Sequence, residues 1–139
     1  MFRVGPVVLF TSGLAGDGVA RNTVHLANAL ACRGAQAEIV CLEAGPLSTE
    51  VRGATITRLG RPPGPRTLAL AAAVPALHRR LRALRPSAVV SMGNHAHLAV
   101  WAALRGLPDI PRIYRISNDP AHRGGERIGL GLRQAGLRL

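Results

Sequence analysis

The stretch Pro6–Gly18, PVVLFTSGLAGDG, carries the strongest indication of fold in this 139-residue chain. Its first part, Pro6 to Thr11, is a short apolar run rich in β-branched residues, which is typical of a strand buried on both faces of a parallel sheet. A glycine-rich turn, Ser12–Gly18, follows at once, and a helical pattern begins directly after it. This order of strand, turn and helix predicts an α/β protein with a parallel sheet.

The rest of the chain continues the alternation of strands and helices. Apolar residues at helical spacing follow the turn, and Gly34 then supplies a stop signal. A second helical stripe runs from Leu70 to Leu84, and Pro75 should either kink that helix or start its main part. Further short apolar runs predict the other strands: Ala37–Leu42, Ala54–Leu59, Ala88–Met92 and Ile110–Ile116. We therefore expect a Rossmann-like, doubly wound, mainly parallel sheet of about five strands.

Length and composition fit one folded domain. With 47% hydrophobic and 18% charged residues, the chain has the composition of a soluble α/β protein rather than of a disordered tail. The longest uncharged stretch, Pro86–Leu104, contains serine, asparagine and histidine residues that a membrane-spanning helix would tolerate poorly. Val4–Phe10 is apolar but no cleavage pattern follows it, so we interpret it as part of the first strand and not as a signal peptide.

The net charge of +11 comes from 18 basic residues, all of them arginine. Arginine grips phosphate and carboxylate groups in two-point geometry, so this charge suits polyphosphate substrates, anionic lipid surfaces or nucleic acid. An arginine-rich solvated surface is the plain alternative. Nucleic acid ranks last among these partners and is not expected, because the few aromatic residues do not alternate with the arginines as a base-stacking platform would.

Cysteine and histidine residues give no sign of a cofactor or a metal ion. Cys32 and Cys41 are nine positions apart, which is neither a metal-binding nor a redox motif, and we expect two reduced, buried thiols of the kind that suit the cytosol. The histidines His95 and His97 have no cysteine, aspartate or glutamate beside them that would complete a metal site. We therefore expect no cofactor and no metal.

Candidate ligand-binding residues follow from the rule that an open parallel sheet binds ligands beyond the carboxyl ends of its strands. The loop after the first strand brings Gly16 and Gly18 to a helix N-terminus, where backbone amides and the helix dipole attract an anion such as phosphate. A merely tight turn is the alternative, since the pattern is not GxGxxG. Asp17 is the one acidic residue of this crevice, and helix capping explains it.

Two more loops should reach the same crevice. After the fourth strand, Asn94 and His95 stand at a helix start, where an imidazole can donate to a sugar hydroxyl or a phosphate; a capping asparagine with surface histidines is the alternative. After the fifth strand come Arg115 and Asn118, candidates for substrate binding, with an Asx-type turn and a solvated arginine as the alternative. No nucleophile elbow and no pair of carboxylates supports a hydrolase.

Three segments, in this order along the chain, resemble family-four glycosyltransferases: Gly16–Leu42, Leu81–Ala103 and Arg112–Asp119. The first is similar to that family's glycine-rich turn, apolar helix and hydrophobic strand. The second is similar to a helix that ends at Arg-Pro, a strand, and a loop with Asn and His. Over most of residues 5–120 the chain thus resembles the N-terminal, acceptor-side domain of a retaining, two-domain (GT-B) glycosyltransferase.

The resemblance implies a hexosyl-type transfer from a nucleotide-sugar donor to a sugar or lipid-linked acceptor. By position, Gly16 and Gly18 would approach the donor phosphates with Arg21 nearby, and Asn94 and His95 would face the reacting sugar or the acceptor, with His95 as the candidate catalytic residue. The alternative is a Rossmann-like module that binds a nucleotide or an effector without catalysis, because a fold does not fix a function.

The resemblance also sets the expected domain organisation. Residues 1–120 should form the Rossmann-like glycosyltransferase domain, and residues 121–139 an incomplete C-terminal segment, truncated before the donor-binding domain. Since the family's donor-binding residues have no counterpart in these matches, we expect no measurable turnover by this chain alone. A cytoplasmic location is expected, peripheral at the inner face of the membrane, where the arginines from Arg79 to Arg85 would contact anionic lipid.

Overall fold

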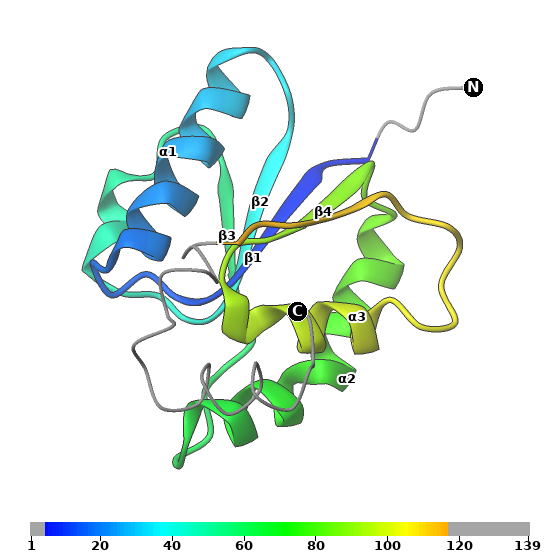
Figure 1. Ribbon diagram of the computed structural model, residues 1–139. Coiled ribbons are helices and arrows are strands. Elements are labelled where there is room, and N and C mark those ends of the chain that lie inside the picture. Colours follow the sequence, from blue (N-terminus) through cyan, green and yellow to red (C-terminus); the bar gives the residue numbers. More distant parts are fainter. Residues whose placement is uncertain (1–4, 117–139) are drawn as a thin grey trace, which may run out of the picture.

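A computed structural model describes residues 5–116, which form a five-stranded sheet covered by helices on both faces (Figure 1). The sheet has the order β3-β2-β1-β4-β5, and all neighbouring strands run parallel. The strands are β1 (Val7–Gly13), β2 (Ala37–Glu43), β3 (Thr55–Arg58), β4 (Ala88–Ser91) and β5 (Arg112–Tyr114). The doubly wound, Rossmann-like sheet predicted from the sequence is confirmed.

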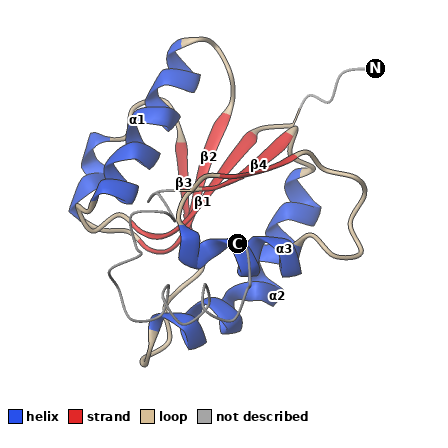
Figure 2. Ribbon diagram, viewed as in Figure 1, coloured by secondary structure: helices blue, strands red, loops and turns tan. Residues whose placement is uncertain are grey.

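The helices divide between the two faces of the sheet (Figure 2). Helix α1 (Gly18–Cys32) covers one face, and helices α2 (Arg66–Leu84) and α3 (His97–Ala103) cover the other, with two short 3-10 helices, η1 (Pro46–Glu50) and η2 (Asn94–Ala96), in the loops. Successive residues of a strand point to opposite faces. In β1, Leu9 therefore joins the core under α1, whereas Val8 and Phe10 join the core under α2 and α3.

Local signals explain where the helices begin and end. Gly34 follows α1 with a φ of 80°, a left-handed conformation that glycine adopts without steric cost, so its predicted stop is confirmed. Helix α2 starts at Arg66, after the proline-rich loop, and ends at Arg85 in a left-handed conformation (φ 48°). Pro75 lies inside this helix, so it does not start the helix's main part.

The two cysteines differ in environment, which corrects one prediction. Cys41 is buried in β2, and its burial raises the pKa of the thiol to about 11. Cys32, in contrast, is exposed, because the last turn of α1 turns this position away from the sheet, and its expected burial is wrong. Within residues 5–116 both thiols are free.

Other predictions concern the ends of the chain and the membrane. Asn118 and the segment 121–139 lie outside the described residues. Among residues 5–116, no helix combines the length and the hydropathy that crossing a bilayer requires.

Candidate functional site

A cavity of about 270 Å³ opens at the carboxyl ends of β1 and β4. These central strands are neighbours, but the chain leaves β1 toward β2 on one side and leaves β4 toward β5 on the other. The loops that follow them therefore diverge, and ligands of doubly wound folds bind at such switch points. The sequence rule predicted a crevice formed by the loops after the first, fourth and fifth strands. The loops after β1 and β4 line the cavity, but no described residue after β5 does.

The first wall of the cavity is the turn into α1. Asp17 caps the helix, since its carboxylate accepts a hydrogen bond from the Ala20 amide at 2.7 Å, and this confirms the capping role. Gly16 has a φ of 101°, which lets the turn fold back before the helix starts. Gly18 begins the helix and lines the cavity, together with Asn22 one turn further on. The positive end of the α1 dipole therefore faces the cavity.

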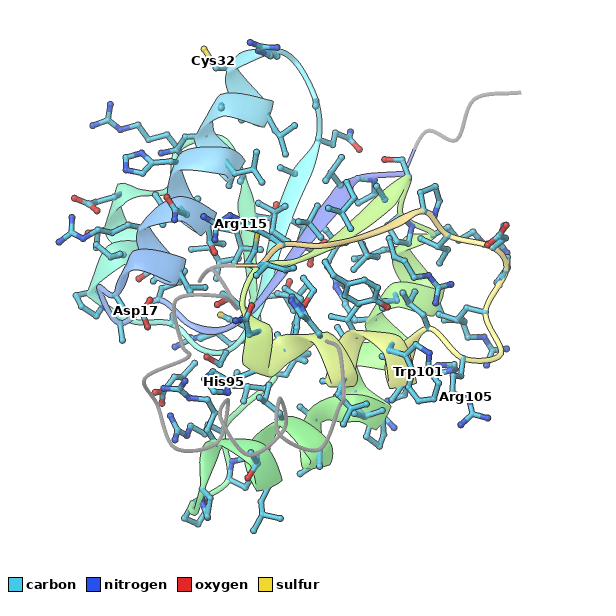
Figure 3. All side chains as sticks on the ribbon, in the orientation of Figure 1. Asp17, Cys32, His95, Trp101, Arg105 and Arg115 are labelled. Carbon is cyan, nitrogen blue, oxygen red and sulfur yellow. The ribbon has the colours of Figure 1, made fainter. Side chains whose placement is uncertain are left out.

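The second wall is the loop after β4, which approaches α1 closely. A Cβ atom placed on Gly93 would lie 3.3 Å from a Val19 methyl carbon, so a glycine permits this approach. Asn94 and His95 follow in η2, and both line the cavity as expected. Figure 3 shows Asp17 and His95 at the same end of the molecule.

Two arginines occupy positions that the sequence did not indicate. Arg21 turns back on its own loop, where its Nε donates to the Gly16 carbonyl at 3.3 Å, and it borders a separate surface depression next to His25. Arg66, at the first position of α2, lines the cavity instead. Its signal in the sequence was the end of the proline-rich loop, since a helix that follows a parallel strand starts at the carboxyl end of the sheet.

His97 lies behind the cavity, between β4 and β5. A hydrogen bond of 2.7 Å joins its Nδ1 to the Ser91 hydroxyl, and its ring meets the ring of Tyr114 edge-on with 5.3 Å between centroids. Burial lowers the pKa of His97, while the backbone of Arg115 acts in the opposite direction and more weakly. Of the two loop histidines, His95 lines the cavity, whereas His97 packs against Ser91 and Tyr114.

Arg115 directly follows β5 and pairs with the end of β4. Its amide donates to the Ser91 carbonyl at 2.9 Å, and its Nη1 is buried without a hydrogen-bond partner among the described residues. Arg115 is not among the residues that line the cavity.

The cavity can hold a small anionic or polar group. Arg66 and the N-terminus of α1 supply positive potential, and Asp17 is the only acidic residue among the described lining residues. Its volume lies just below the range of about 300 to 1,000 Å³ typical of ligand pockets, so it can enclose a phosphate or a sugar ring, and the rest of a nucleotide sugar would lie outside it. Nowhere in residues 5–116 do three potential metal ligands gather.

Comparisons with known proteins agree with this fold. A family model described as glycosyl transferase 4-like domain matches residues 17–138. Among solved structures, the chain is similar to CalG4, the calicheamicin glycosyltransferase, with a TM-score of 0.63 and 19% identity over 97% of this chain and 36% of that chain. It is also similar to the glycotransferase of kitacinnamycin, with a TM-score of 0.57 and 18% identity over 94% of this chain and 35% of that chain.

A third similar structure is the C-terminal domain of a hydrogenase from Pyrococcus furiosus, with a TM-score of 0.53 and 12% identity over 83% of this chain and 94% of that chain. A search of the curated proteins finds no match.

The likeness to a hydrogenase domain shows that structural similarity at this level reports the fold alone. The chain spans about a third of the length of the two glycosyltransferases. The sequence match, by contrast, covers most of the chain. The fold is that of a Rossmann-like half of a GT-B glycosyltransferase, and the chain belongs to the glycosyl transferase 4-like domain family.

Proposed function

We propose that this chain is the acceptor-binding domain of a glycosyltransferase that transfers a sugar from a nucleotide-sugar donor with retention of configuration. The observation that carries the proposal is the meeting of the α1 N-terminus, Arg66 and His95 around one cavity at the switch point of the sheet. Free amides at a helix N-terminus and a nearby guanidinium are both ligands for phosphate oxygens.

Each lining group has a role in this proposal. The backbone at Gly18, with Arg66, faces the donor phosphates, and Asn94 holds a sugar hydroxyl. Gly16 is not among the lining residues and shapes the turn that leads to them. His95 is the catalytic candidate, because an exposed imidazole at the cavity can donate to the reacting sugar or shuttle a proton. Arg115 supports the site by joining the ends of β4 and β5.

Calorimetric titration tests the binding role. Nucleotide sugars should bind the chain, and Arg66→Gln should weaken them about tenfold or more, the effect expected for one charge-assisted hydrogen bond. Arg33→Gln is the matched control, because Arg33 is exposed at the far end of α1. Equal weakening by both variants would contradict the assigned cavity. Free nucleotide or NAD binding as tightly as nucleotide sugars would favour the non-catalytic module instead.

Turnover by the 139-residue chain itself is not expected. A leaving nucleoside diphosphate carries at least two negative charges, and the described cavity offers Arg66 as its only arginine. A product assay with a radiolabelled donor measures this directly, and transfer by the purified chain would refute it. Retention would be tested with any longer protein that contains this domain and transfers the sugar. NMR of the product would show whether the anomeric configuration of the donor is kept.

We also propose that the transfer takes place at the cytoplasmic face of an anionic membrane, which would hold a lipid-linked acceptor. Its support is the exposed arginine surface of α2, Arg79, Arg82 and Arg85. Co-sedimentation with vesicles containing phosphatidylglycerol should retain the chain, whereas vesicles of phosphatidylcholine should not. If the chain bound neither kind of vesicle, the proposed membrane contact would be wrong, but the role proposed for the cavity would not be affected.

A further inference from the structure

A second hollow, a groove of about 1160 Å³, lies at the end of the sheet remote from the cavity. It runs between the last two turns of α2 and the loop that leads from α3 to β5, and so lies near the amino ends of β4 and β5. The apolar side chains of Leu81, Leu107 and Ile110 belong to its lining. Three arginines, Arg79, Arg82 and Arg85, line it as well and are exposed to solvent.

These three arginines have no partner within residues 5–116, in contrast to their neighbour Arg80. Arg80 donates from Nε and Nη2 to Glu38 Oε1, at 2.9 and 2.7 Å, and so belongs to the fold. The other three form no ion pair and no side-chain hydrogen bond with any described residue. Asp109 in the adjacent loop does not line the groove. Among residues 5–116, nothing therefore compensates the positive charge of the groove.

The spacing of the arginines suits one anionic group. Arg79 and Arg82 are three residues apart on α2, so their side chains leave the helix about 4.5 Å apart along its axis, and Arg85 follows directly after the helix. The C-terminus of α2 contributes roughly half a negative charge, which three full positive charges outweigh. The groove is also held open by the fold, because His78 Nδ1 donates to the Ala103 carbonyl at 2.8 Å and ties α2 to α3.

Exposed apolar side chains lie on α3, the helix that leads into the groove loop. On α3, Leu98 is 74% exposed and Trp101 48%, and the Arg105 guanidinium lies 5.2 Å from the centre of the Trp101 ring. Figure 3 shows Trp101 and Arg105 at the end of the molecule away from Asp17 and His95, and Arg105 directly precedes Gly106 of the groove. Tryptophan is enriched at membrane interfaces, because its ring is apolar while its indole N–H can remain in contact with water. Arginine beside it adds a positive charge at the level of the head groups.

We infer that this groove binds the phosphate head group of an anionic phospholipid, with Arg79 and Arg82 at the phosphate and Trp101 among the first acyl carbons. The inference rests on the proposed membrane contact and gives it a defined site. A soluble polyanion such as RNA would use the charge but not the neighbouring apolar side chains, which is why the phospholipid is the occupant that the groove fits.

Vesicle binding by a charge-matched pair of variants tests the site. Arg79→Gln/Arg82→Gln should lower the affinity for vesicles containing phosphatidylglycerol by about tenfold or more. The control, Arg33→Gln/Arg52→Gln, removes the same charge from exposed positions on the α1 side of the sheet and should change the affinity less than threefold, a roughly estimated margin for long-range charge. Neither groove side chain forms an ion pair or a hydrogen bond with a described residue, and thermal melts would verify that both variants are folded.

The single tryptophan provides a readout that needs no substitution. Its fluorescence should shift to the blue with phosphatidylglycerol vesicles, and brominated acyl chains should quench it. Equal loss of binding in both double variants would contradict the phospholipid site in the groove, and so would an unshifted tryptophan spectrum on bound vesicles. In both cases the proposed membrane contact would still hold. If the unmodified chain does not bind vesicles, the membrane contact and the groove fall together. Displacement of the vesicles by RNA at equal phosphate concentration would also overturn it.

Discussion

The cavity and the groove lie at opposite ends of one sheet and are built from different parts of the chain. The cavity is shaped by backbone: a helix N-terminus, a tight turn, and the approach of Gly93 to Val19. The groove is made by long side chains on the last turns of α2. The difference implies that a larger side chain should impair ligand binding in the cavity, whereas the removal of arginine charge should impair binding in the groove.

The largest effect separates the arginines of α2 into structural and binding groups. Arg80→Met should lower the free energy of unfolding by about 2 to 3 kcal/mol, because it leaves the Glu38 carboxylate, 5% exposed, without its cation. This lies at the low end for a buried pair, since the Arg80 side chain is itself 36% exposed and Thr57 still donates to Glu38. Urea denaturation measures the change.

Arg79→Met is the matched control for that experiment. It removes the same charge and keeps the same stem length, but no described contact is lost, so the change should stay within about 0.5 kcal/mol. If Arg79→Met destabilised the protein as much as Arg80→Met, Arg79 would belong to the fold and the groove would lose a binding group.

The second effect tests whether backbone approach shapes the cavity. Gly93→Val should weaken nucleotide-sugar binding about tenfold and cost about 1 to 3 kcal/mol of stability, because its side chain would push against Val19 and part the two walls. Combining it with Val19→Ala should restore much of both losses, since the two changes compensate in volume. Binding that survives Gly93→Val unchanged would show that the walls do not need this contact.

The third effect distinguishes capping from charge at Asp17. Asp17→Ala should cost about 1 kcal/mol through loss of the hydrogen bond to the Ala20 amide. Asp17→Asn should keep that bond and remove the only acidic group of the described lining, so anion affinity should rise a few-fold. Thermal melts and phosphate titrations of both variants measure the two effects. A lower anion affinity in Asp17→Asn would place the carboxylate among the binding groups.

Sequence reasoning succeeded where the signal was local. The apolar run before Gly13, the cap at Asp17 and the stop at Gly34 each concern a few neighbouring residues, and the structure confirms them. Strand order and the switch point then follow from general rules of doubly wound sheets, which brought Asn94 and His95 to the cavity.

Residues fixed by tertiary structure could not be found in this way. Arg66 enters the cavity because α2 begins there, and Arg21 turns aside to its own loop, yet neither outcome leaves a local pattern. The exposure of Cys32 depends on the phase of the last turn of α1. The groove joins the end of α2 to a loop more than 20 residues later, so only the fold reveals it.

The smallest expected effect concerns His97, which is half-buried and contacts Ser91 and Tyr114 at the ends of β4 and β5. Above pH 6.5, its ordinary pKa, the ring is neutral in both the folded and the unfolded chain and adds no pH dependence. As the pH falls below 6.5, the unfolded chain takes up a proton that the half-buried ring resists, so the free energy of unfolding falls until the pH reaches the lowered pKa. His97→Gln should flatten this decline in urea midpoints measured at pH 7.5, 6.5 and 5.5. Equal slopes in the wild type and in His97→Gln would mean that the ring protonates without opening its bond to Ser91, and that the pairing behind the cavity tolerates an imidazolium.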